Sequence, residues 1–204
     1  MIGHTIIGRN IIALRQLKPT QMTVGMLQVK HKRKGIRKFA KQPAELVEFI
    51  LEHPIRVVRG PVGKVYVIDH HHLALALIKE QYATAPMQVE EDFSACDTRE
   101  FWKKMRESGF IYPYDAKGKH KSVADIPKTL FGLKDDPYRS LAGFVRLEGG
   151  FSKVETPFAE FLWAHYFREH VPEKLVAKRF PKALKQAMAL AKHSEAQHLP
   201  GYIS

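Results

Sequence analysis

A short β-branched segment that runs directly into a histidine cluster and an apolar helix pattern most constrains the fold of this chain. Residues 65–68 (Val-Tyr-Val-Ile) have the composition of a buried strand, and residues 73–78 (Leu-Ala-Leu-Ala-Leu-Ile) continue as a buried helix would. Asp69-His-His-His72 lies between them. A strand therefore delivers a polar cluster to a helix N-terminus, where free N–H groups and the helix dipole favour an anion.

The segments on either side of this junction predict a small mixed sheet with helices packed on it. Pro43 suits a first helical position, and Pro54 ends that helix. Gly60-Pro-Val-Gly63 predicts a hairpin turn between two strands. The predicted elements are strands at residues 6–7, 11–12, 55–58, 65–68 and 87–91, and helices over residues 43–53 and 70–82. The fold class predicted from them is α+β.

The second half of the chain has mainly helical sequence patterns. Helical patterns cover residues 97–108, 158–170 and 172–198, the last with a break before Pro181, and a turn-rich passage follows the first. We therefore expect two units: a mixed α+β domain over residues 1–95, and a helical extension over residues 96–204 that packs on it.

Composition places the chain in a broad class of proteins. The 204 residues contain one cysteine, Cys96, which cannot form an internal disulfide and fits a reducing compartment. No apolar run reaches 18 residues, and the N-terminus lacks the layout of a secretory signal. We expect a cytoplasmic protein that does not enter a membrane.

The positive charge is concentrated at the start of the chain. The net charge is +12, and residues 1–44 hold ten Lys or Arg and no acid, whereas residues 45–204 hold 23 basic and 21 acidic residues. This segment is either a contact surface for nucleic acid or another anion, or a solvated face that keeps the protein soluble. The candidate contact residues are Lys30, Lys32, Arg33, Lys34, Arg37 and Lys38.

The three histidines do not have the spacing of a metal site. Neighbouring helical residues point about 100° apart, so His70, His71 and His72 cannot all face one ion. Contact between one or two of them and a phosphate fits the spacing better. Asp69 has two interpretations: an N-cap of the following helix, or a functional carboxylate.

Residues 67–74 resemble the phosphate-binding signature of the ParB/sulfiredoxin superfamily, in which a strand is followed by Asp-Gly-His-His-Arg and an alanine-rich helix. The chain is most similar to the branch named "Putative ParB-like nuclease". The resemblance lies in residues 17–21, 65–72, 101–102, 135–142 and 158–161. It implies a site in which His70, His71 and His72 hold phosphate, with ATP, ADP or CTP and Mg²⁺ as the cofactors expected. Asp69 or His71 would then act as the base.

This chain departs from the signature at two positions. The glycine after the aspartate is replaced by His70, and the arginine after the histidine pair is missing. Arg139 is the best substitute, with Ser140 beside it and Arg146 seven residues further on.

The same segment carries two candidate metal ligands. Asp135 and Asp136 are candidates for Mg²⁺. The alternative is a loop in which Asp136 caps a turn and Arg139 pairs with a carboxylate. Glu160, further along the chain, is interpreted as incidental.

These observations support one leading function and one alternative. The first is binding of a nucleotide or phosphorylated small molecule, with phosphotransferase or nucleotide hydrolase activity as its extension. The alternative is a nucleic-acid-associated module, with or without nuclease activity, that uses the basic N-terminal segment.

Overall fold

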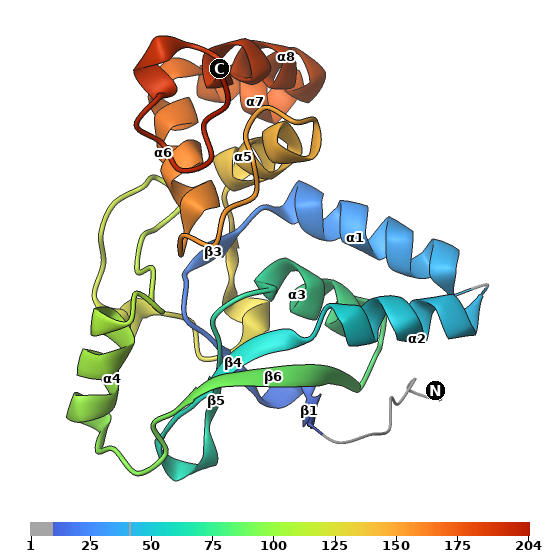
Figure 1. The fold of residues 1–204 in the computed structure, drawn as a ribbon, viewed down its shortest axis with the longest axis vertical. Coiled ribbons are helices and arrows are strands. Elements are labelled where there is room, and N and C mark those ends of the chain that lie inside the picture. Colours follow the sequence, from blue (N-terminus) through green and yellow to red (C-terminus); the bar gives the residue numbers. More distant parts are fainter. Residues whose placement is uncertain (1–9, 41) are drawn as a thin grey trace.

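A curled five-stranded mixed sheet lies in the N-terminal half of the computed structural model, which describes residues 10–40 and 42–204 (Figure 1). The strand predicted at residues 6–7 lies outside these. The strand order is β1-β6-β4-β5-β2. The strands are β1 (Ile11–Ala13), β2 (Leu17–Pro19), β4 (Ile55–Arg59), β5 (Val65–Val67) and β6 (Thr84–Asp92). β4 and β5 form the predicted antiparallel hairpin, with Val57 opposite Val67. β2 pairs in parallel with β5, and β6 pairs in parallel with β4.

Helices from both halves of the chain surround this sheet. They are α1 (Met26–Phe39), α2 (Pro43–Glu52), α3 (His71–Lys79), α4 (Thr98–Glu107), α5 (Pro137–Leu147), α6 (Ala159–His170), α7 (Glu173–Lys178) and α8 (Phe180–Ala191). Figure 1 shows α1 crossing between the C-terminal helices and the pair α2 and α3. None of the helices in the described part of the chain is long and apolar enough to cross a membrane.

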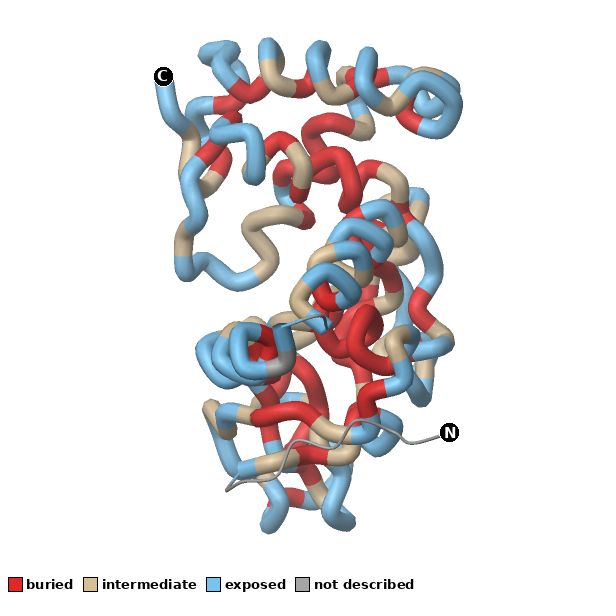
Figure 2. Tube along the Cα trace, turned by 90° about the vertical axis from the view of Figure 1, so that its right-hand side faces the viewer, coloured by how far each residue is buried: buried red, intermediate tan, exposed pale blue. Residues whose placement is uncertain are grey.

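Three apolar clusters form the interior (Figure 2). The first joins the sheet to α1, α2 and α3 and includes Leu130 and Leu133. The second joins α5 to the helices that follow, around the stacked rings of Phe151 and Trp163. A third, smaller cluster packs α4 on the sheet through Phe101. The boundary that we predict at residue 95 stays a prediction.

Close contact between α1 and α5 connects the two halves. A parallel pair of short strands, β3 (Thr23–Val24) and β7 (Lys134–Asp135), leads into these helices. A Cβ atom on Gly25 would lie 2.6 Å from the backbone nitrogen of Ser140, and one on Gly143 would overlap the Gln28 side chain. Glycine at both positions is what lets the two helices approach this closely.

The α+β fold class is confirmed, and two helices are present that the predicted elements above do not include. The basic run at residues 30–38 is part of α1, which begins at Met26. Residues 137–147 form α5, beyond the turn-rich passage. The Asp136-Pro137 pair was the available signal for α5, since aspartate is a good N-cap and proline suits the first turn.

Candidate functional site

The helix of the histidine motif begins with a left-handed residue. His70 is the N-cap of α3 and has φ 66° and ψ 26°, a conformation that costs glycine nothing and that histidine tolerates better than most residues. The glycine at this position of the family signature is thus explained by backbone geometry. His70 Nδ1 lies 2.9 Å from the carbonyl oxygen of Pro54, which holds the ring in place.

Asp69 does not cap α3 in the way that the N-cap interpretation requires. Its Oδ1 accepts a hydrogen bond from the adjacent His70 N–H at 2.6 Å, and the side chain of the N-cap residue, His70, forms no capping hydrogen bond. The Asp69 side chain is 55% exposed, and its Oδ2 lies 3.9 Å from His70 Nε2. The first-turn N–H groups of α3 are therefore not capped by Asp69 or His70, and the Asp69 carboxylate lies beside them.

The other two histidines hold the loop between β2 and α1 against α3. The Nε2 atom of His71 accepts a hydrogen bond from the Thr20 N–H at 3.4 Å, and that of His72 accepts one from the Gly25 N–H at 3.0 Å. Each ring must be unprotonated at Nε2 to accept these bonds.

Electrostatics agree with this structural role. Burial lowers the pKa of His71 to about 3, and burial together with the charges of Arg139, Lys32 and Arg146 holds the pKa of His72 well below its usual range. Both rings are therefore neutral near pH 7. The prediction that His71 and His72 contact a phosphate stays a prediction, and neutral rings would bring no positive charge to it. His71 is unsuited to proton transfer at that pH.

Arg139 is a buried cation whose charge acts on His71 and His72, and its guanidinium lies over an aromatic ring. Arg139 is only 4% exposed, and its guanidinium carbon lies 3.6 Å from the centre of the Phe161 ring. The centre of the Tyr112 ring lies 4.0 Å from that of Phe161, and the centre of the Tyr114 ring lies 4.4 Å from that of Tyr112, with both pairs of rings tilted. Arg139 also depresses the pKa of both His71 and His72, so its charge is directed at the start of α3.

The hydrogen-bonding capacity of Arg139 is largely unused. Its Nη1 lies 3.4 Å from Glu160 Oε2, which is a long contact, and its buried Nε has no partner among the described residues. Burial lowers the pKa of Arg139 while the charges of Glu160 and Asp136 raise it. A guanidinium has five N–H donors, so this cation is poorly satisfied by the protein itself.

Lys32 and Arg146 complete a basic cluster around Arg139. Arg146 Nε donates to Glu160 Oε1 at 2.7 Å, so Glu160 joins the two arginines. Burial lowers the pKa of Lys32, whereas the charges of Glu160 and Asp69 raise it. All the charged groups that act on Lys32 do so through space rather than through a hydrogen bond. We call Lys32, Arg139 and Arg146 the basic cluster; Glu160 is its counter-ion, which sequence reasoning missed.

The predicted magnesium ligands have other partners. Asp136 is 2% exposed and caps α5 through Oδ1, while its Oδ2 accepts from Arg168 Nη2 at 2.6 Å. Asp135 Oδ1 accepts from the Met26 N–H at the start of α1. The described residues contain no group of three His, Cys, Asp or Glu side chains that could hold a metal. The geometry thus matches the alternative interpretation, in which Asp136 caps and Arg139 pairs with a carboxylate.

Ser140 also serves the fold. Its hydroxyl accepts a hydrogen bond from the Leu27 N–H at 3.2 Å, and the residue is fully buried beneath the start of α1. Its predicted contact with phosphate receives no support from this position.

The basic run divides between two faces of α1. Lys32 faces the basic cluster, and most of the other residues line a groove of about 290 Å³ between α1 and the end of α3. The lining residues are Met26, Val29, Lys30, Arg33, Lys34, Arg37 and Lys79. Lys38 does not line this groove and lies in the last turn of α1.

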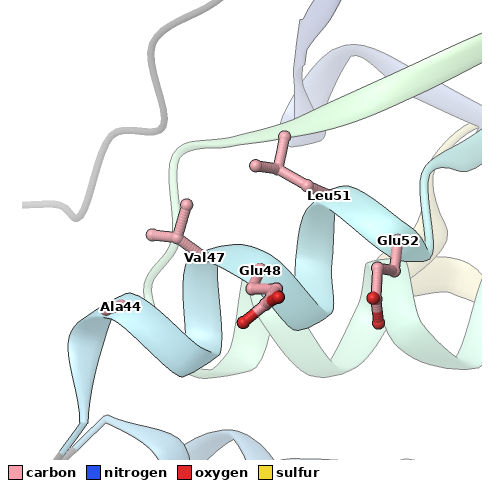
Figure 3. Close-up of a pocket in the computed structure, with 5 residues that line it drawn as sticks. All are labelled: Ala44, Val47, Glu48, Leu51 and Glu52. Carbon is pink, nitrogen blue, oxygen red and sulfur yellow. The ribbon is translucent and has the colours of Figure 1, made fainter.

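A larger hollow on the outer face of α2 has no such chemistry. It measures about 730 Å³ and is lined by Ala44, Val47, Glu48, Leu51 and Glu52. Figure 3 shows these side chains along one helix, with no basic or nucleophilic group among those drawn. We therefore place the candidate site at the start of α3.

Comparisons with known proteins identify the family of this chain. A family model described as "Putative ParB-like nuclease" matches residues 10–169. The chain belongs to this family. Its matched region contains α3 with its histidines and all three members of the basic cluster, whereas α7 and α8 lie beyond it.

A solved structure is similar to this chain over nearly its whole length. The crystal structure of protein Atu1540 from Agrobacterium tumefaciens has 42% sequence identity and a TM-score of 0.84, over 95% of this chain and 96% of that one. No curated protein matches the chain.

Proposed function

We propose that this ParB-like protein binds a phosphate-bearing ligand, either a nucleotide or a phosphorylated small molecule, at the N-terminus of α3. The ligand phosphate would lie between the first-turn N–H groups of α3 and the basic cluster. The observation that carries this proposal is the state of Arg139, a buried guanidinium whose Nε has no hydrogen-bond partner among residues 10–40 and 42–204 and whose Nη1 makes one long contact with Glu160.

A buried and poorly paired arginine is costly for a fold to retain. Leaving a buried charged donor without an acceptor costs about 1–3 kcal/mol or more. A phosphate would remove that cost because it accepts two parallel N–H bonds from one guanidinium. Arg139 then does the work of the arginine that the motif lacks, and Lys32 and Arg146 add positive charge from α1 and α5.

Phosphoryl transfer or nucleotide hydrolysis at this site would require a base. Asp69 is the better placed of the two candidates, because its carboxylate is half exposed at the start of α3 and one oxygen is free of a close hydrogen bond. The buried and neutral His71 already uses Nε2 to hold Thr20. We therefore assign the chemical step, where there is one, to Asp69.

Thermal denaturation tests binding without any assumption about catalysis. ATP, ADP and CTP, each with Mg²⁺, and inorganic phosphate are added separately at increasing concentration. A ligand at 100 times its Kd stabilises the native state by about 2.7 kcal/mol, which raises Tm by about 5–10 °C in a chain of this size.

A matched pair of variants identifies the site. Lys32→Met removes a cation of the basic cluster, whereas Lys30→Met removes the same charge two residues away on a different face of α1. We expect Lys32→Met to lose most of the ligand-induced shift and Lys30→Met to retain it. No shift with any of the four ligands, or an equal loss in both variants, would contradict the proposal.

A further inference from the structure

The groove between α1 and the end of α3 has a second concentration of positive charge, separate from the basic cluster. Lys30, Arg33, Lys34 and Arg37 follow the spacing i, i+3, i+4, i+7, so they form one stripe along α1. Lys79 faces them from α3. Like charges at these spacings destabilise a helix by about 0.2–0.5 kcal/mol per pair. The stripe therefore works against the stability of α1.

The Glu80 carboxylate pairs with two arginines of the stripe and leaves most of its positive charge unneutralised. Glu80 accepts from Arg33 Nε at 2.5 Å and from Arg37 Nε at 2.7 Å, and its own side chain is only 12% exposed. Two arginines are thus anchored through their inner nitrogens. Within the described part of the chain, Lys30, Lys34 and Lys79 form no ion pair, so five cations face one acid.

We propose that the α1–α3 groove binds the phosphodiester backbone of nucleic acid. The inner surface of the groove is mostly apolar, and five cationic side chains surround it, so a polyanion would be held by the charges at its rim. Arginines held at Nε present their outer nitrogens in the fork that suits phosphate. The stripe from residue 30 to residue 37 spans about 10 Å of helix, which faces about three successive phosphates of one strand.

This surface is independent of the proposed phosphate site at the start of α3. Lys30 and Lys32 are two residues apart, so they point about 200° away from each other around α1. Contacts with backbone phosphates carry no sequence information, and we therefore expect binding that is general and strongly dependent on salt.

Fluorescence anisotropy with a labelled 20-base-pair DNA duplex of arbitrary sequence tests the inference. We expect the full chain to bind at 50 mM salt, with a slope of log K against log salt of about −4.5 for five cations. Substitution of Lys30, Lys34 and Lys79 by glutamine is expected to make this slope less steep by about 2.7.

The matched control removes three exposed lysines from α7 and α8, namely Lys178, Lys182 and Lys185, by the same substitution. This control lowers the net charge equally, and we expect it to bind as the unmodified chain does. Equal loss in both triple variants, or no DNA binding by the unmodified chain at 50 mM salt, would overturn the inference. Displacement of DNA by poly-glutamate at equal charge concentration would also overturn it, in favour of an acidic protein partner.

Lys32→Met separates the two proposals. We expect Lys32→Met to bind DNA normally and to lose the nucleotide-induced thermal shift. The groove variant, in which Lys30, Lys34 and Lys79 are replaced by glutamine, is expected to lose DNA binding and to keep that thermal shift. Loss of DNA binding in Lys32→Met equal to that in the groove variant would show that DNA uses the basic cluster instead.

Discussion

The same substitution at two glycines of one helix is expected to change stability in opposite directions. Gly25 is the N-cap of α1, and Gly35 lies in the interior of the same helix. A Cβ atom at Gly35 would have no neighbour within 4 Å. A Cβ atom at Gly25 would lie 2.6 Å from the nitrogen and hydroxyl oxygen of Ser140 and 2.8 Å from its Cα.

The magnitudes follow from these contacts. Gly35→Ala is expected to raise the free energy of unfolding by about 0.5–1 kcal/mol, because alanine loses less backbone entropy than glycine in a helix. Gly25→Ala adds an atom that meets the backbone of α5, and such overpacking costs about 1–3 kcal/mol. Separation of the helices also weakens the bonds from the Leu27 N–H to Ser140 and from the Gly25 N–H to His72, each worth about 1 kcal/mol. The total loss is about 2–4 kcal/mol.

Guanidinium chloride unfolding followed by circular dichroism measures both variants on one scale. We expect the midpoint concentration to rise for Gly35→Ala and fall for Gly25→Ala, with the slope m unchanged in each. The contact between α1 and α5 would be refuted by a neutral or stabilising Gly25→Ala. A destabilising Gly35→Ala would refute the open environment of the second glycine.

Two further predictions concern buried charge. The pKa of His71 in the folded protein is about 3, below the unfolded value of 6.5, so its contribution to stability is complete above pH 6.5 and falls by up to about 1.4 kcal/mol per pH unit as the pH drops. His71→Gln keeps an acceptor for the Thr20 N–H without titrating, and urea unfolding between pH 7 and pH 4 should show a shallower pH dependence; parallel curves would contradict this. Asp136→Asn removes the buried charged partner of the partly buried Arg168 and is expected to cost about 3–5 kcal/mol, whereas Asp135→Asn, which keeps an exposed acceptor for the Met26 N–H, is expected to cost less than about 1 kcal/mol. Comparable losses of Tm in these two aspartate variants would argue against the buried Asp136–Arg168 pair.

The junction at residues 65–79 could be predicted from the sequence because its signals are local. A β-branched strand, a polar break and an apolar helix follow one another along the chain, and the structure places β5 and α3 there. The hairpin at Gly60–Gly63 and the helix break before Pro181 were predictable for the same reason. Such signals specify elements, and the fold class follows from their order.

The roles of the site residues could not be predicted in this way, since they depend on contacts between distant segments. His71 and His72 are neutral because residues 20–25 cover them. Glu160 has no local feature that distinguishes it, yet it contacts arginines 14 and 21 residues earlier in the chain. Nothing near Arg139 in the sequence indicates that Phe161 will hold its guanidinium.

The counter-ion of the basic cluster connects these observations to ligand binding. Glu160 holds Arg146 through a 2.7 Å hydrogen bond but contacts Arg139 only at 3.4 Å. A phosphate that approaches the start of α3 would therefore compete with Glu160 for Arg139 at little cost, while Arg146 stays anchored. Because both neighbouring histidines are neutral near pH 7, the attraction for that phosphate at this pH comes from arginine and lysine. Titration of His71 and His72 therefore cannot regulate this site near that pH, and their contribution is to fix the loop that leads into α1 and so to position Lys32.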